Sequence, residues 1–240
     1  MSRTQSFVTV ALVSVGLMGA GCGGVDGPSE WDDSALIDVD ASGEKADSAR
    51  STSTFYKFRH DMRRCLSPVC GGYFVSRVNF TKTKCVDGSW QSECYVSGLD
   101  TRALGADANL ERVTLLRGTL KPQTFGTFGT YALFVVSEAW APINDGAPTG
   151  LFHRMTDSGI RCVRAPCPTI RAAKLNSTIA SNVTDVDFTA SGGTPAELRG
   201  SRPSMYTDGF LAVGAHSAQG EHKTFVVSQY FKRVRGANVP

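Results

Sequence analysis

The sequence lacks the short motifs that mark the common catalytic and nucleotide-binding sites. It has no G-x-S-x-G nucleophile elbow, no H-E-x-x-H metal motif, no phosphate-binding glycine loop and no dinucleotide-binding fingerprint. No C-x-x-C pair is present either, which removes the motif of a thioredoxin-like redox protein. Histidine is scarce, with four residues in 240. We therefore predict a protein that is not an enzyme and has no cofactor.

The histidines leave one enzymatic alternative, an envelope hydrolase with a non-standard site near His60, His216 or His222. His60 is followed by Asp61, but neighbours on a strand point to opposite faces and do not act together. His216 and His222, with Glu221, could hold a metal ion loosely across a hairpin. Exposed turn residues are the simpler interpretation, so we predict no metal site.

No apolar run reaches the roughly 20 residues of a membrane-spanning helix. The run Phe7–Met18 follows Arg3 and ends in three small residues before Cys22, which is the layout of a secretory signal. The small-small-Cys ending resembles the lipobox of bacterial lipoproteins, in which the cysteine is acylated and becomes the first mature residue. We expect a signal peptide over residues 1–21 and a lipid anchor on Cys22, which places the protein in the cell envelope, in the outer membrane, facing the periplasm or the surface. An ordinary signal with a chance cysteine is the alternative.

Six further cysteines remain once Cys22 carries the anchor. An even number in an exported chain predicts three disulfides. Zinc is the alternative, but the intervals are longer than zinc ligand pairs favour, and no histidine lies inside a pair. Six cysteines allow many pairings, and the spacing favours the local ones: Cys65–Cys70, Cys85–Cys94 and Cys162–Cys167.

Charge divides the mature chain into two parts. Residues 22–54 carry a net charge of −6 and show no sustained apolar period, which is typical of a disordered acidic tether. Residues 55–240 carry 22 basic and 14 acidic side chains, a net of +8, and form the expected domain. A basic domain favours anionic partners, although a merely soluble surface is the simpler interpretation. We expect the membrane as partner through the anchor, an anionic or protein partner beside it, and no specific nucleic acid.

The domain contains an internal repeat. Arg64–Cys70 and Arg161–Cys167 share the pattern R-C-x4-C at an offset of 97 residues, and Asn79 and Asn176 follow at the same offset. Phe134–Trp140 and Phe225–Phe231 then match at an offset of 91. We predict pseudo-repeats over about 55–140 and 152–231 that pack around one core, with chance similarity in a β-rich chain as the alternative.

Each repeat is predicted to contain about five strands and one short helix, so the fold class is mainly β. Glycine- and proline-rich residues 140–149 join the repeats. The expected strands are 73–78, 94–99, 113–120 and 131–140 in the first repeat, 170–175, 183–188, 210–215 and 224–231 in the second, and the expected helices are Ala106–Arg112 and Pro195–Arg199.

Two features suit binding better than catalysis. The loops Cys65–Cys70 and Cys162–Cys167 each hold a proline and a disulfide, and such preorganised loops lose little entropy on docking, as in disulfide-clamped protease inhibitors. The guanidinium groups of Arg64, Arg161 and Arg164 could bind carboxylate or phosphate there. Bridges that only keep the turns closed are the simpler alternative. The glycine-rich aromatic run 124–131 could likewise contact a ligand or fold onto the sheet.

The motifs R-C-x4-C-G-G at Arg64–Gly72, E-C-Y-V at Glu93–Val96 and C-x3-P-C-P at Cys162–Pro168 resemble those of an uncharacterised family of bacterial lipoproteins. The family is known only as a domain of unknown function, and the resemblance covers roughly residues 55–232. It implies no activity and no site residues. The sequence thus predicts a non-catalytic, lipid-anchored binding or structural module of the cell envelope, with a disulfide-stapled, inhibitor-like module or an envelope hydrolase as alternatives.

Overall fold

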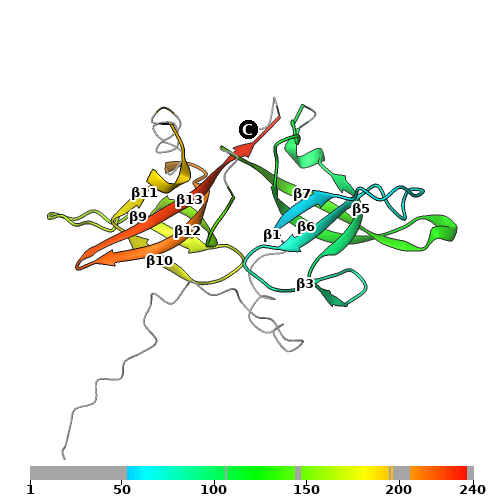
Figure 1. The fold of residues 1–240 in the computed structure, drawn as a ribbon, viewed down its shortest axis with the longest axis horizontal. Helices are drawn as coiled ribbons and strands as arrows, with labels where there is room; N and C mark the ends of the chain where they lie inside the picture. The colour runs from blue at the N-terminus through cyan, green and yellow to red at the C-terminus, as the bar shows by residue number, and fades with distance from the viewer. Residues whose placement is uncertain (1–52, 106, 144–146, 195, 197–205, 237–240) are drawn as a thin grey trace, which may run out of the picture.

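The computed structural model describes residues 53–236 apart from 106, 144–146, 195 and 197–205, and it is mainly β (Figure 1). The signal peptide, the anchor at Cys22 and almost all of the acidic tether, which were predicted from sequence, lie outside the described residues. The helical elements that the structure describes are single 3₁₀ turns, and none of the described helices is long and apolar enough to cross a membrane.

The first repeat forms a closed ring of five strands. β1 pairs with β2 on one side and with β6 on the other, and β6 and β7 form a hairpin. β5 closes the ring because it pairs antiparallel with β2 and parallel with β7. The strands are β1 (Thr54–His60), β2 (Tyr73–Arg77), β5 (Cys94–Asp100), β6 (Leu115–Thr124) and β7 (Thr130–Pro142), with β3 (Thr83–Lys84) and β4 (Trp90–Gln91) as a small separate hairpin.

The second repeat has the same connectivity. β8 pairs with β9 and β12, and β12 and β13 form the hairpin. The place of β5 is taken by two short strands, β10 beside β9 and β11 parallel to β13. The strands are β8 (Leu151–Asp157), β9 (Ile170–Lys174), β10 (Ala180–Val183), β11 (Asp185–Asp187), β12 (Phe210–Gln219) and β13 (His222–Val234).

We count β10 and β11 together as the third strand of the second ring. The spatial order in both rings is then 1-2-3-5-4, with strands three and five parallel. This is the connectivity of the OB fold, a five-stranded Greek-key sheet. The disulfide loops, residues 61–72 and 158–169, connect strands one and two of their rings. The hairpin tips connect strands four and five.

The two rings join edge to edge through the last strands of the repeats. β7 and β13 pair antiparallel from Ala139↔Val234 to Pro142↔Phe231, which makes one continuous sheet from the two halves seen in Figure 1. Apolar side chains form three clusters: one in the first repeat, one in the second, and a central one that contains residues of both. Trp140 and Phe231, which correspond in the repeat, are both buried in the central cluster.

A reciprocal pair of asparagines locks the repeats together. Asn79 donates from Nδ2 to the Phe152 carbonyl (2.8 Å) and accepts from the Phe152 amide (2.9 Å). Asn176 makes the same pair of bonds to Phe55, both at 2.8 Å. Both asparagines have positive φ, 65° and 59°, a conformation that asparagine tolerates better than most residues. Each repeat therefore holds the first strand of the other, and the internal repeat has a physical counterpart in the fold.

Glu138 is the buried charge beside this junction. Its carboxylate pairs with Arg117 (2.8 Å) of its own repeat and Arg154 (2.7 Å) of the other, and it accepts a bond from Trp140 Nε1 (3.0 Å). Burial by itself would raise the pKa of Glu138, but the two guanidinium groups outweigh it and hold the pKa below its ordinary value. The corresponding buried residue of the second repeat is Gln229.

The strand predictions agree with the structure, including the hairpins of both repeats. The helix predicted over Ala106–Arg112 is wrong, because residues 107–112 form turns and the 3₁₀ turn η2 (Arg102–Leu104) comes earlier. The Asn109 side chain accepts a bond from the Glu111 amide, a local bond that competes with helix formation. The helix predicted over Pro195–Arg199 falls almost wholly outside the described residues. In the second repeat the 3₁₀ turn η4 (Thr189–Ser191) follows β11.

Candidate functional site

The two disulfide loops are the candidate site, because they carry the predicted arginines and project from the rings. The three disulfides join the cysteines in the local pairs that the spacing favoured. Cys65–Cys70 closes the first disulfide loop (residues 61–72) and Cys162–Cys167 closes the second (residues 158–169). Figure 1 places these loops at opposite ends of the molecule.

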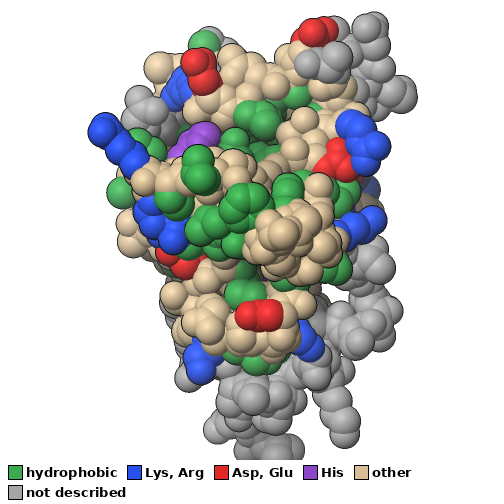
Figure 2. All heavy atoms as spheres, turned by 90° about the vertical axis from the view of Figure 1, so that its right-hand side faces the viewer, with side chains coloured by type: hydrophobic (Ala, Val, Ile, Leu, Met, Phe, Trp, Pro, Cys, Tyr) green, Lys and Arg blue, Asp and Glu red, His purple; other side chains and the backbone are tan. Residues whose placement is uncertain are grey.

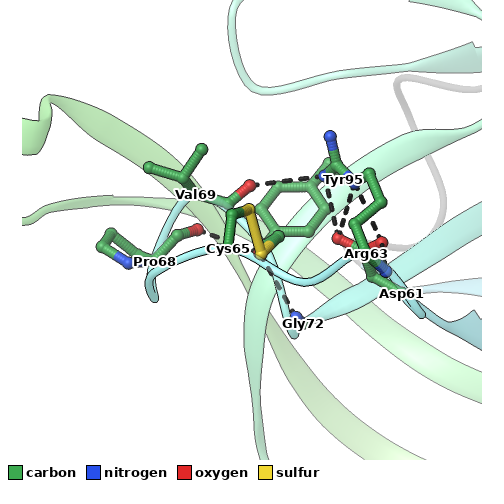
Figure 3. Close-up of a disulfide and its surroundings, with 8 residues drawn as sticks. Asp61, Arg63, Cys65, Pro68, Val69, Gly72 and Tyr95 are labelled. Atoms are coloured by element: carbon green, nitrogen blue, oxygen red, sulfur yellow. Dashed lines mark hydrogen bonds and ion pairs between the residues drawn. A yellow bond between two sulfur atoms is a disulfide. The ribbon is translucent and has the colours of Figure 1, made fainter.

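The first disulfide loop is held from inside by an ion pair (Figure 3). Asp61, the first residue after β1, has a buried carboxylate that accepts bonds from Arg63 Nε and Nη2 at 2.8–3.0 Å. The bonds from Arg63 hold the pKa of Asp61 below its ordinary value. Arg63 Nη2 also donates to the Val69 carbonyl (3.3 Å), so one guanidinium joins both sides of the loop.

Tyr95 supports the same loop from β5. Its hydroxyl donates to the Pro68 carbonyl (2.9 Å) and accepts from the Gly72 amide (3.3 Å), as Figure 3 shows. Burial raises the pKa of Tyr95 above its ordinary value near 10. Gly72 is required here, because a Cβ would lie 2.1 Å from the Val96 carbonyl oxygen and 3.0 Å from the tyrosine oxygen.

The tip of the first loop is a closed turn. Val69 N donates to the Leu66 carbonyl (3.0 Å) around the cis bond between Ser67 and Pro68. With the disulfide, the ion pair and Tyr95, this turn has little freedom left. It presents its side chains at fixed positions, which is the preorganisation that lowers the entropic cost of docking.

Those side chains are apolar and exposed to solvent. Met62 is 85% exposed, Leu66 76% and Val69 40%, and Phe128 from the adjacent β6–β7 hairpin tip is 51% exposed. Figure 2, which views this end of the molecule, shows hydrophobic side chains gathered in the middle of the face, with lysine and arginine as well as some acidic side chains around them. Four large exposed apolar side chains on one end are more than scattered surface residues. We call these four residues the apolar tip.

A row of aromatic rings underlies the apolar tip: Phe74, Tyr95, Tyr131 and Phe125. Successive rings meet edge to face, at interplanar angles of 63°, 81° and 71°. The Arg63 guanidinium lies 5.4 Å from Phe74 and 5.3 Å from Tyr95. Rings that meet edge to face in this way support one another and the loop above them.

The second disulfide loop is held differently. Arg161 pairs with Asp157 (2.7 Å) and lowers the pKa of that carboxyl to about 2. Ser158 Oγ donates to the Pro168 carbonyl (2.9 Å) at the other end of the loop. Val163 corresponds to Leu66 and is fully exposed. Both loops therefore present an aliphatic side chain at the same position.

An open groove lies beside the second loop. Asn182 stands opposite Arg171 as Tyr95 stands opposite Phe74, so a short amide replaces the tyrosine that fills the first repeat. The resulting space is about 350 Å³. It is lined by Pro166, Pro168, Ser181, Asn182, Thr184, Glu221 and Lys223.

The three predicted binding arginines lie in different settings. Arg164 is exposed next to Val163, and Arg64 is exposed two positions before Leu66. Arg161 instead forms an ion pair with Asp157. The ion pair between Asp61 and Arg63 inside the first loop was not predicted from the sequence. The offset of 97 aligns Asp157 with His60, one residue before Asp61, and Arg161 with Arg64, one residue after Arg63. The two Asp–Arg pairs therefore do not align, and the repeat comparison did not reveal them.

The three histidines singled out from sequence are not brought together, but His216 packs edge to face against the buried fourth histidine, His153, with ring centroids 5.5 Å apart. His60 lies in the first repeat, where its ring centroid is 4.6 Å from that of Tyr73. His216 pairs in register with Phe225 and is hydrogen-bonded to Ser181, whereas His222 pairs with Gln219. The alternative in which His216 and His222 come together across the hairpin is therefore wrong. Within the described part of the chain, no three histidine, cysteine or acidic residues form a group that could hold a metal ion.

Comparison with known proteins yields a family but no function. No curated protein matches the chain, and no solved structure matches it. A family model does match, over residues 54–237, which include both rings and both disulfide loops. The three disulfides of this region are consistent with an extracellular or envelope protein. The chain belongs to the family described as a domain of unknown function, DUF6748.

Proposed function

We propose that this protein is a non-catalytic binding module of the cell envelope, carried on a lipid anchor at Cys22 and set off from the membrane by its acidic tether. Support for the anchor is the signal-like segment before Cys22 and the even number of remaining cysteines. The function lies in the two disulfide loops, which present side chains to partners outside the molecule.

The observation that carries this proposal is the exposure of the same apolar position in both loops. Leu66 and Val163 follow the first cysteine of each loop, and each extends into solvent from a disulfide-closed turn. Exposing a large aliphatic side chain on a rigid turn gives no folding benefit, because the hydrophobic effect favours its burial. A docking function explains why the position is both clamped and exposed.

The conformation of the first loop favours docking over substrate-like inhibition. A segment that binds a protease as a substrate would is extended, so that its backbone pairs as an added strand. The Leu66–Val69 turn is closed by its own hydrogen bond and offers no such strand. The loop is therefore better suited to insert side chains than to pair its backbone.

Photo-crosslinking in living cells tests the proposal. A photoreactive residue at position 66 or 163 is expected to capture an envelope component, whereas the same residue at exposed position 232, outside the loops, is not. Metabolic labelling with a fatty acid should mark the wild-type protein and fail with Cys22→Ser. Absence of loop-dependent capture at both positions, or turnover of a substrate that one point mutation abolishes, would contradict the proposed function.

A further inference from the structure

We infer that the apolar tip of the first repeat docks onto a phospholipid surface, so that the module contacts the membrane through Met62, Leu66, Val69 and Phe128 as well as through its anchor. This inference rests on the proposed function, since it identifies the partner of one of the two loops.

The shape of the apolar tip fits a membrane better than a pocket. Its exposed side chains come from two projections, the first disulfide loop and the β6–β7 hairpin tip, whose backbones extend from the same end of the molecule (Figure 1). A convex apolar tip needs an apolar medium that yields around it, and the boundary between headgroups and acyl chains is such a medium. The rigidity of the loop means that insertion orders no additional backbone.

The charge around the apolar tip is complementary to lipid phosphate. Arg64 is exposed between Met62 and Leu66, and it makes no ion pair with any residue that the structure describes. Arg63 beside it is more than half exposed although it is paired with Asp61. Arginine next to inserted apolar side chains is the arrangement of interfacial membrane anchors, in which the cation meets headgroups while the apolar groups enter the acyl region.

The position of the anchor makes this contact easy to reach. The chain from Cys22 to the start of β1 at Thr54 would span about 30 Å as a random coil. A domain held at that distance experiences a high effective concentration of membrane, so even a weak membrane contact would be formed for much of the time. One flat bilayer contacts one end of the molecule, and the end that carries four large exposed apolar residues is that of the first repeat.

Vesicle binding by the unacylated chain tests the inference. The probe is the chain from residue 22 with Cys22→Ser, mixed with vesicles of phosphatidylcholine containing about a third phosphatidylglycerol, and bound protein is measured by flotation. We expect binding that the triple variant Met62→Ser, Leu66→Ser, Phe128→Ser weakens by about tenfold or more. The matched control, Val163→Ser with Ile179→Ser at exposed positions of the second repeat, should bind as the parent does.

A second measurement reports insertion directly. Tryptophan fluorescence of Leu66→Trp should shift to shorter wavelength when vesicles are added, and that of Val163→Trp should not. No vesicle binding by the parent chain, equal binding by the triple variant, or no shift for Leu66→Trp would each overturn the inference. If position 66 captures a protein in cells while vesicles are not bound, the lipid inference fails and the proposed binding function stands. If neither loop captures anything, the proposed function fails as well.

Discussion

The two repeats share a strand order, a disulfide loop and a hairpin tip, yet they differ in what lies under the loop. In the first, Tyr95 fills the space and bonds to Pro68 and Gly72, and the aromatic row continues beneath it. In the second, Asn182 and small polar residues leave a groove of about 350 Å³. One copy of the repeated unit carries a supported, apolar projection, and the other has a groove beside its loop. The same framework can thus serve two different contacts, because the residues under a loop change without altering strand pairing.

Exchanging Gly72 and its counterpart in the second repeat, Thr169, should have the largest effect on stability. Gly72 corresponds to Thr169, and the carbonyl of each accepts a hydrogen bond from the amide of the first residue of its loop, Asp61 or Ser158. Gly72→Thr would drive a Cβ against the Val96 carbonyl, so we expect a loss of about 3 kcal/mol or more in the free energy of unfolding. The reciprocal Thr169→Gly should cost about 1 kcal/mol or less, since it only removes a half-buried side chain. Urea denaturation checks both, and equal effects would contradict the model of differently supported loops.

Converting Glu138 to its counterpart in the second repeat should have the next largest effect. Glu138→Gln leaves Arg117 and Arg154 without their anion in a largely buried site, which we expect to cost about 3 kcal/mol at neutral pH. The folded pKa of Glu138 lies below its ordinary value near 4.5, so its contribution is present above that pH and disappears as the pH falls through the folded pKa. Denaturation of both proteins from pH 7 to pH 3 should therefore show the difference shrinking, and a constant difference would show that the charge is not the cause.

Tyr95 tests how much the loop support contributes. Tyr95→Phe removes only the hydroxyl and should cost about 1 kcal/mol. Tyr95→Asn, which introduces the residue of the second repeat, also empties the space beneath the loop and should cost about 2 kcal/mol or more. Hydrogen exchange of the Gly72 amide should be faster in both variants. Unchanged exchange with Tyr95→Phe would show that the hydroxyl does not hold the loop.

The smallest expected effect concerns the ion pair of the second loop. Arg161 lowers the pKa of Asp157 to about 2 from an ordinary value near 3.8, so the pair stabilises the fold above about pH 3.8 and is lost as the pH falls toward 2. Asp157→Asn should remove this part of the acid dependence and leave the stability at low pH nearly unchanged. Because the pair is partly exposed, salt should weaken it. A dependence on pH identical to that of the parent chain would contradict this assignment.

Much of the fold could be predicted because its signals are local. Alternating apolar residues indicated the strands, the offset of 97 residues indicated the repeat, and short intervals favoured the disulfide pairs that the structure forms. The failed helix at Ala106–Arg112 shows the limit of such patterns, since a single side-chain bond from Asn109 selects a turn there. The alternative in which His216 and His222 come together failed for a related reason. Hairpin register depends on the turn and is not visible in residue spacing alone.

By itself, the amino-acid sequence determined that this is a duplicated, mainly β protein with a closed loop at the same place in each copy. Only the tertiary structure decided how those loops are supported, because that depends on residues far apart in the chain. Tyr95 reaches under a loop that ends 23 residues earlier at Gly72, Asn176 holds Phe55 across 121 residues, and Arg154 joins Glu138 across the junction of the repeats. Such contacts leave no periodic trace in sequence. They form only when closing the rings brings their strands together, and that closure determines which side chains remain exposed for a partner.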